Sequence, residues 1–290
     1  MLSNAPKNIA LTFVIIVFES IYAQEIVPDQ LRLKEIYATR IQTPPVLDGV
    51  LDDEAWENVL PESEFLQFKP YNLELPAEKT EVRIVYDNDY IYVAVNCLTS
   101  HPEKIVGRLG RRDSWSEVLG PKSDWAVVAF DSNNDDRTGY HFFVNPAGSR
   151  MDVALTGPGM GGFDPSWNAV WDFKSALNED GWSIEYRFPF SIFPFEANSD
   201  QDWGFFAARH IQYKQEETQW PCVPFGVEGF VPYYGVLKGI SDVPPPKKLE
   251  VVPYLLSGNT NDLNMNSTGI DLKYGFSGRS ALNLTFNPDF

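Results

Sequence analysis

An acidic segment near the start of the chain is the first candidate for chemistry. Residues 45–60 read PVLDGVLDDEAWENVL, which places four acids within seven positions, beside Trp56. A glycosidase needs two carboxylates that face each other across a cleft, about 5 to 9 Å apart, in environments that separate their pKa values. Acids on one short turn share solvent instead. We therefore interpret the segment as a structural corner, in which Asp52 or Asp53 is the N-cap of a helical turn and Trp56 and Val59 close the end of the core.

A second acidic stretch has spaced oxygen ligands. DSNNDDRTG, residues 131–139, places Asp131, Asn133 and Asp135 at alternate positions, as at the start of a calcium loop. The stretch lacks the glycine at position six and the glutamate at position twelve of an EF-hand. Two interpretations stay open: a hairpin turn with solvated acids, or a weak calcium site. Calcium is the one cofactor that we carry forward as a candidate.

Tryptophans in polar surroundings are the candidates for ligand binding. Trp115 lies in RDSWSE, Trp167 in DPSWNA and Trp220 in TQWPC. An exposed indole can stack on the apolar face of a sugar ring while polar neighbours bind the hydroxyls. Packing against the core is the alternative for each of them. Trp182 and Trp203 begin apolar runs, so we expect them to pack inward.

Other motifs point less clearly to function. GPGMGG, residues 157–162, formally matches a dinucleotide-binding loop, but Pro158 interrupts it and no helical pattern follows, so we expect a loop beside a site. The three histidines lack metal-ligand spacing. Cys97 and Cys222 could form a disulfide in an exported chain, or stay free.

The start of the chain and its charge restrict the location and the partners. Residues 1–23 combine Lys7 with a short apolar run and end in IYA, which predicts a secretory signal peptide. We expect residues 24–40 to be an N-terminal extension. A net charge of −17 and a pI near 4.5 exclude nucleic acid as a partner, because nucleic-acid binding needs a basic surface.

The elements that position these residues are short strands. Turn signals recur every 8 to 15 residues, and helical patterns are scarce. This pattern predicts an all-β fold, an antiparallel β-sandwich over residues 41–242. The predicted strands are EVRIVYD, YIYVAVNCL, WAVVAFD, YHFFVNP, MDVALT, WSIEYRFPF, WGFFAARHIQY and YYGVLKGI.

The composition changes at the proline-rich DVPPPKK, so we place a domain boundary near residue 243. Residues 243–290 predict a linker and three strands in which apolar and polar residues alternate. Such strands suit a soluble sheet or a membrane barrel, and three strands cannot close a barrel. If they are barrel strands, we expect this region to be the incomplete beginning of an outer-membrane β-barrel.

Several segments together resemble a known family. PPVLDGVLDDEAWENV, EVRIVYDNDYIYVAVNC, SDWAVVAFDSNND, DGWSIEYRFPFS and WGFFAARH follow in order the pattern of family 9 carbohydrate-binding modules, over about residues 41–240. RRDSW, DDRTGYHFFVNPAGSRMD, LKYGF and LTFNPDF resemble the subgroup in which such a domain precedes an outer-membrane barrel of unknown function. The resemblance implies a β-sandwich exported to the periplasm or outer membrane of a Gram-negative-type bacterium, with its own C-terminal barrel as a partner.

The resemblance also implies a sugar site. Trp115 corresponds to a stacking platform and Phe230 to the opposing aromatic face, with Asp124 and Asn145 as ligands of the sugar hydroxyls. Trp167 joins them as a candidate from its own loop.

The sequence departs from the pattern of the family at two positions. Val127 stands where a glutamate is usual, and Phe143 stands where an arginine is usual. Half of the polar contacts that the resemblance implies are therefore missing.

Three functional hypotheses follow. The first is non-catalytic binding of an oligo- or polysaccharide in glycan recognition, uptake or catabolism at the cell envelope. The second is a plug or interaction domain that serves the barrel and binds no sugar. The third is a glycoside hydrolase with acids from separate loops, such as Asp113 and Asp164. No carboxylate pair can be assigned an acid and a nucleophile, so we expect no catalysis.

Overall fold

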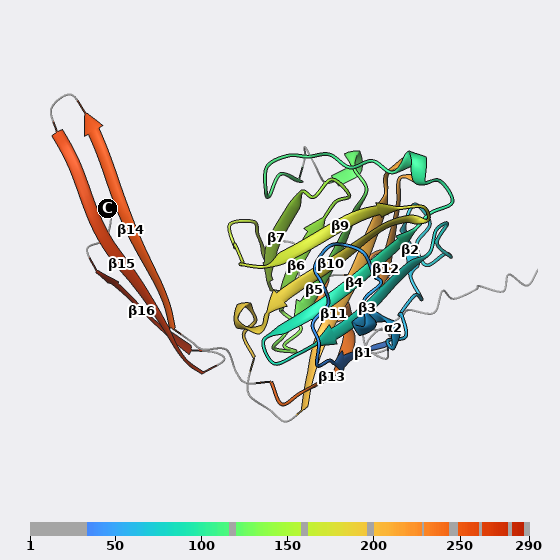
Figure 1. Ribbon diagram of the computed structural model, residues 1–290, viewed down its shortest axis with the longest axis horizontal. Helices are drawn as coiled ribbons and strands as arrows, with labels where there is room; N and C mark the ends of the chain where they lie inside the picture. The colour runs from blue at the N-terminus through green and yellow to red at the C-terminus, as the bar shows by residue number, and fades with distance from the viewer. Residues whose placement is uncertain are drawn as a thin grey trace, which may run out of the picture.

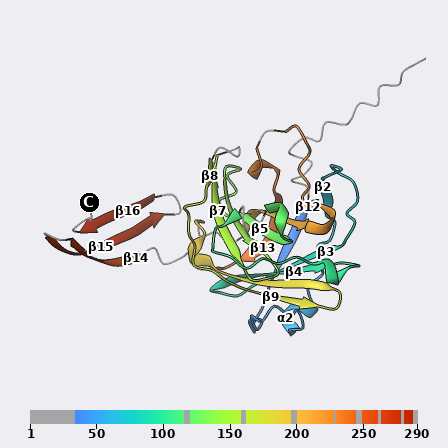
Figure 2. The same cartoon turned by 90° about the horizontal axis from the view of Figure 1, so that it is seen from above.

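Two β-sheets packed face to face form the larger part of the structure (Figures 1 and 2). The computed structural model describes residues 34–115, 120–157, 162–195, 200–227, 229–243, 249–260, 263–277 and 280–286. The predicted all-β, sandwich-like fold is confirmed. The predicted signal peptide and residues 158–161 of the glycine-rich stretch lie outside the described residues.

The first sheet has the strand order β8-β7-β6-β5-β11-β13-β1, and β12 pairs with both β11 and β2. The bounds are β2 (Leu66–Lys69), β5 (Trp125–Asp131), β6 (Thr138–Val144), β7 (Arg150–Thr156), β8 (Phe163–Asp164), β11 (Asp200–Ile211), β12 (Glu216–Trp220) and β13 (Gly235–Ser241). All of these neighbours pair antiparallel except β13 and β1.

The second sheet has the order β1-β3-β4-β10-β9. Its strands are β1 (Glu35–Arg40), β3 (Thr80–Tyr86), β4 (Tyr90–Leu98), β9 (Asp172–Asn178) and β10 (Gly181–Pro189). The first half of β1 pairs in parallel with β13 and its second half pairs in parallel with β3, so this strand joins the two sheets. The sandwich therefore begins before residue 41, where we expected it to start.

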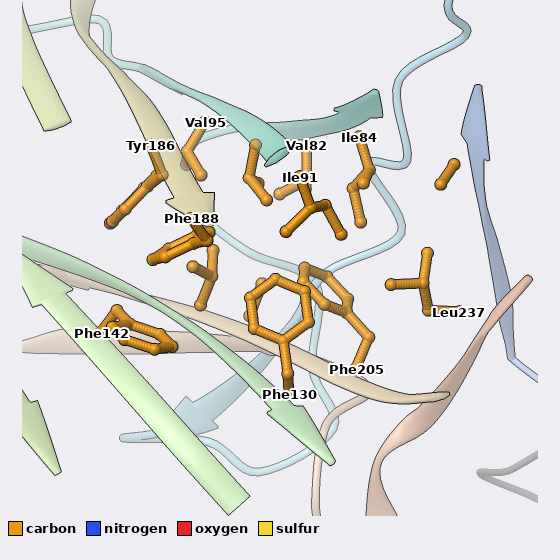
Figure 3. Packing of buried hydrophobic residues seen from close by; sticks show 14 of the residues in the cluster. Val82, Ile84, Ile91, Val95, Phe130, Phe142, Tyr186, Phe188, Phe205 and Leu237 are labelled. Carbon is orange, nitrogen blue, oxygen red and sulfur yellow. The ribbon is translucent and has the colours of Figure 1, made fainter. Parts of the chain in front are cut away.

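The core lies between the sheets and is rich in aromatic rings (Figure 3). Alternate side chains of each strand point into it, as the period of a strand requires. Phe188 of β10 meets Phe130 and Phe142 of the opposite sheet, with ring centroids 5.5 and 4.4 Å away. Cys97 is part of this core, and both cysteines are free and buried, so the structure contains no Cys97–Cys222 disulfide.

Helices are few and short. The α-helix α2 spans Glu54–Glu57, and short 3-10 turns lie at Pro102–Lys104, Gly120–Lys122, Phe190–Ile192, Gln212–Lys214 and Val231–Tyr233. Across the part of the chain that the structure describes, none of the helices has the length and hydropathy to span a membrane.

The acidic segment is a structural corner, as predicted, and a buried acid from another strand anchors it. Glu185 of β10 is fully buried and accepts a hydrogen bond from Trp56 Nε1 at 2.9 Å. Its other carboxylate oxygen accepts the backbone N–H groups of Asp48 and Gly49 at 2.9 and 2.8 Å. We call residues 41–60 the corner cover, because Trp56 and Val59 pack with Val85 and its neighbours on the outer face of the second sheet.

The N-cap of α2 differs from the expectation in one respect. Asp53 occupies the N-cap position, but its side chain makes no capping hydrogen bond. Its carboxylate instead accepts the N–H of Val46 at 2.9 Å and so closes the turn that precedes the helix.

The C-terminal strands form a separate three-stranded antiparallel sheet (Figure 1). The strands are β14 (Leu249–Thr260), β15 (Leu263–Ser277) and β16 (Ser280–Phe286). The three predicted strands are therefore confirmed, and a barrel built on them stays a prediction.

Candidate binding site on the outer face of the first sheet

A second hydrophobic cluster covers the outer face of the first sheet. Because successive side chains of a strand point to opposite faces, Val127 of β5 lies outside while Val128 packs in the core. The segment that follows β12 folds back over this outer face, and its Val223, Val231 and Tyr234 pack there. We call this segment, residues 221–227 and 229–234, the loop cover.

The loop cover leaves a pocket of about 750 Å³ between itself and the sheet. This volume falls within the range of small-molecule binding sites. The floor is formed by side chains from β5, β6, β7 and β11, the walls by Trp115, Phe163 and the loop cover, and one end by residues of β2 and β12.

Trp115 forms one wall of the pocket. Its ring centroid lies 5.8 Å from that of Trp125 and 5.4 Å from that of Phe143. The residue is 41% exposed to solvent. Gly120 allows this position: its φ is +56°, and a Cβ there would lie 3.3 Å from Trp115 Nε1. The N–H edge of the indole therefore lies beside Gly120, and the ring lines the pocket.

Phe230 also lines the pocket, from the loop cover. Its ring packs on Phe206 at 4.7 Å and on His141 at 6.0 Å. Burial lowers the pKa of His141 to about 3, so the imidazole is neutral at physiological pH. Its Nε2 lies 2.6 Å from Tyr234 Oη, and this contact holds the floor against the cover.

Polar groups gather at the β12 and β2 end of the pocket. Gln219 donates to Glu217 at 3.0 Å and accepts the N–H of Val223 at 3.2 Å. Lys69 lies opposite Glu217 in the antiparallel pair of β2 and β12. Burial raises the pKa of Glu217, which the Gln219 hydrogen bond and the charge of Lys69 oppose. The pocket thus has an ammonium group and a carboxylate among its lining residues at one end.

Both residues that were predicted to bind sugar hydroxyls are buried outside the pocket. Asp124 is 1% exposed, and its carboxylate accepts the N–H of Val106 at 2.8 Å. Asn145 is fully buried, donates to the carbonyl of Arg108 at 2.8 Å and accepts the N–H of Ser149 at 2.9 Å. Neither residue lines the pocket. In this structure both side chains hold backbone segments in place.

Trp167, the remaining predicted sugar residue, also lies outside the pocket. Its ring packs against Tyr140 at 4.8 Å and Phe142 at 5.8 Å, at the margin of the inter-sheet core. Of the five predicted sugar-binding residues, the structure brings Trp115 and Phe230 together.

The candidate calcium loop is the turn between β5 and β6. Asp131 is buried and accepts the N–H of Asp136 at 2.9 Å, while Asp135 accepts those of Arg137 and Thr138 at 2.8 Å. Burial raises the pKa of Asp131 to about 6. Within the described ranges, no group of three or more His, Cys, Asp or Glu side chains is arranged to hold a metal. The carboxylates of the turn therefore bind backbone amides of the turn itself.

The acids of the hydrolase hypothesis are separate from the pocket. Asp113 accepts the N–H of Asp152 at 3.2 Å, and Asp164 accepts both the N–H and the hydroxyl of Ser166. Burial raises the pKa of Asp113, whereas the Ser166 hydrogen bonds lower the pKa of Asp164. Neither acid lines the pocket.

Sequence reasoning missed the polar end of the pocket. Glu217 belongs to EETQW, where both faces of the strand carry polar residues, so the alternation gives no signal. Lys69 is distant in the sequence and reaches Glu217 only through strand pairing. The two departures from the family pattern do mark the floor: Val127 and Phe143 are direct cross-strand neighbours, and both line the pocket.

Comparisons with known proteins give likeness in structure alone. No protein-family model matches the chain, and no curated protein matches it. A family 9 carbohydrate-binding module from Caldicellulosiruptor kristjanssonii, solved with glucose, is similar with a TM-score of 0.51 at 17% identity, over 73% of this chain and 100% of that one. A structure of such a module from the same organism with cellotriose gives a TM-score of 0.51 at 15% identity, over 72% and 96%. The fold of this chain is therefore similar to that of family 9 carbohydrate-binding modules.

Proposed function

We propose that the chain is a non-catalytic carbohydrate-binding protein whose site is the pocket under the loop cover. The observation that carries the proposal is that Trp115 and Phe230 line one pocket. Similar solved structures are described as complexes with glucose and cellotriose, which supports a saccharide as the ligand class.

The pocket offers the two kinds of contact that a sugar needs. Trp115 packs against Phe143, and Phe230 packs against His141. Phe143 and His141 are two positions apart on the same face of β6, about 7 Å apart along the strand. Aromatic faces can stack on the C–H face of a sugar ring. Glu217 supplies an acceptor and Lys69 a donor for hydroxyl groups at the same pocket.

The place of action in this proposal is the cell envelope, in glycan recognition, uptake or catabolism. The N-terminal segment with its apolar run supports export. The net charge of −17 suits a neutral saccharide better than an anionic polymer.

Calorimetric titration of the chain with gluco-, xylo- and manno-oligosaccharides tests the proposal. We expect saturable binding that Trp115→Ala weakens at least tenfold, because one stacking face is lost. Trp167→Ala is the matched control, since this tryptophan lies outside the pocket, and circular dichroism would check that both variants fold. No binding by the folded chain, or equal losses in both variants, would contradict the proposal.

A second proposal rests on the C-terminal sheet. Its register aligns Val251, Leu272 and Leu284 in one cross-strand row, and the neighbouring row contains Ile270 and Phe286. Val251, Leu284 and Phe286 are exposed. One apolar face is what a strand group of an outer-membrane barrel presents to lipid, which supports β14, β15 and β16 as strands of such a barrel; in this second proposal the sandwich serves the barrel as an interaction domain.

Cysteine cross-linking in outer-membrane fractions of cells that produce the protein tests this second role. A cross-link between the exposed Tyr71→Cys of the sandwich and cysteines placed along the barrel strands, unchanged by added saccharide, would favour it. Recovery of the chain in the soluble fraction without cross-links would contradict it.

A further inference from the structure

The division of the pocket into a polar end and an apolar remainder points to a more specific ligand. We propose that the pocket binds a saccharide that carries an apolar substituent, such as an alkyl, acyl or aryl group, with the sugar at the Lys69–Glu217 end. This inference rests on the proposed function and narrows its ligand class.

The polar end can satisfy only a few hydroxyl groups. Gln219 already uses its carbonyl oxygen for Val223 and one N–H for Glu217. His141 shares Nε2 with Tyr234. Hydrogen-bonding capacity for a ligand is therefore concentrated at the pairing of β2 with β12, on the Lys69 ammonium, the Glu217 carboxylate and the second N–H of Gln219.

The rest of the floor is apolar. One cross-strand row runs from Phe143 through Val127 and Ala208 to Gln219. The row crosses three strand spacings, so its aromatic end at Phe143 lies about 14 Å from its polar end at Gln219. Phe225 lies against Phe68 of β2, with ring centroids 5.1 Å apart, and Phe163 of β8 lines the pocket at the opposite end. Phe225 and Phe163 are 53% and 40% exposed.

An oligosaccharide that spans the pocket places some of its hydroxyl groups over apolar side chains. Sugars carry hydroxyl groups along their whole length, and a hydroxyl buried without a partner loses the hydrogen bonds that it makes with water. An apolar group over Val127 and Phe143 instead gains from leaving water. A pocket of about 750 Å³ is large enough for a drug-sized ligand, which a sugar with a substituent resembles in size.

A matched ligand series tests the inference. Methyl, octyl and phenyl β-glycosides of glucose, xylose and mannose would be titrated into the 290-residue chain by calorimetry, below the micelle concentration of the octyl compounds. An octyl ether of triethylene glycol is the control with the same chain and no sugar. We expect octyl or phenyl glycosides of at least one sugar to bind at least tenfold more tightly than the methyl glycoside, and the ether to bind at least tenfold more weakly than the octyl glycoside.

Variants separate the two halves of the site. Phe163→Ser should reduce the advantage of the octyl over the methyl glycoside at least threefold, because this exposed ring on β8 lines the pocket at the end away from β2 and β12. Glu217→Gln should weaken the methyl and octyl glycosides by the same factor. Leu177→Ser is the control, since Leu177 is exposed on β9 of the other sheet and should change neither.

The outcomes distinguish this inference from the proposed function. Equal affinity for methyl and octyl glycosides overturns the inference and leaves saccharide binding intact. Equal affinity for the octyl ether and the octyl glycoside overturns both, because the sugar is then not recognised. Absence of binding by any glycoside to the folded chain also overturns both.

Discussion

The two outer faces of the sandwich are covered in different ways. The corner cover is anchored to the second sheet by Glu185, which accepts three hydrogen bonds from it, and by Trp56, which packs on the outer face of that sheet. The loop cover contacts the first sheet through apolar side chains and leaves a pocket of about 750 Å³. Each cover lies beside a tryptophan and a carboxylate, Trp56 with Glu185 and Trp115 with Glu217, and the second pair lines the pocket.

The difference shows that residue types alone do not tell a structural anchor from a candidate binding site. Trp56 is 2% exposed and donates its N–H to a buried acid, whereas Trp115 is 41% exposed. Glu185 has three protein donors, and Glu217 accepts from Gln219 at the pocket. A side chain favours a binding role when it keeps hydrogen-bonding groups or ring surface that the protein itself does not use.

The largest expected effect comes from removing the anchor of the corner cover. Glu185→Ala leaves two buried donors, on Gly49 and Trp56, and the part-buried N–H of Asp48 without an acceptor, so we expect it to lower the free energy of unfolding by about 4 kcal/mol. Glu217→Ala is the matched change under the loop cover and should cost about 1 kcal/mol or less. Urea unfolding measures both. Similar losses in the two variants would contradict the distinction between the covers.

Two glycines give a second matched pair. Gly49 has φ +92°, and a Cβ there would lie 2.8 Å from the backbone carbon of Ser175, so Gly49→Ala should destabilise the fold by about 3 kcal/mol. Gly120 has φ +56° and faces the Trp115 side chain, so Gly120→Ala should cost about 1 kcal/mol and weaken ligand binding. Thermal unfolding and titration check the pair, and a tolerated Gly49→Ala would show that the corner cover is less closed than the structure indicates.

Two buried groups beneath the covers should make the stability depend on pH with opposite signs: His141 beneath the loop cover and Glu185 beneath the corner cover. Burial lowers the pKa of His141 from 6.5 to about 3, so its contribution to stability is present above pH 6.5 and is lost as the pH falls toward 3. We expect a loss of about 2 kcal/mol between pH 7 and pH 5 that His141→Gln removes. Burial raises the pKa of Glu185, so its contribution is present below 4.5 and is lost as the pH rises through the pKa of the folded state.

Urea unfolding at pH 5 and pH 7 of the unsubstituted chain, His141→Gln and Glu185→Gln tests these signs. The result that would contradict the account is an equal pH dependence in the unsubstituted chain and in His141→Gln.

The smallest expected effect on stability belongs to the rim of the pocket. Phe163→Ser should change the free energy of unfolding by about 0.5 kcal/mol or less, because the ring is 40% exposed. It should nevertheless weaken binding of the apolar ligands. Urea unfolding and titration of the same sample check both, and a loss of stability without a loss of affinity would remove Phe163 from the site.

The sequence predicted the long strands better than the short ones. YIYVAVNCL and WAVVAFD coincide with β4 and β5, because these strands are buried on both faces and turns bound them. β1, β2 and β12 were missed, since they are short or polar on both faces and depend on pairing with distant strands.

The candidate site was predictable only in part. Trp115 was predicted from its polar surroundings and from the family resemblance, Phe230 from the resemblance alone, and both line the pocket. Asp124 was expected to bind sugar but accepts the N–H of Val106, because a sequence does not show which backbone amide a carboxylate will meet after folding. Glu217 and Lys69 come together only when β12 pairs with β2.

Indole N–H resonances give the most direct test of the central claim, which is that ligand binds under the loop cover. The chain has eight tryptophans, and two of them, Trp115 and Trp125, line the pocket. On titration with an octyl glycoside or an oligosaccharide that binds, we predict that the NMR signals of Trp115 and Trp125 shift while those of Trp56 and Trp182 stay in place. Shifts at Trp56 or Trp167 without a shift at Trp115 would contradict the account.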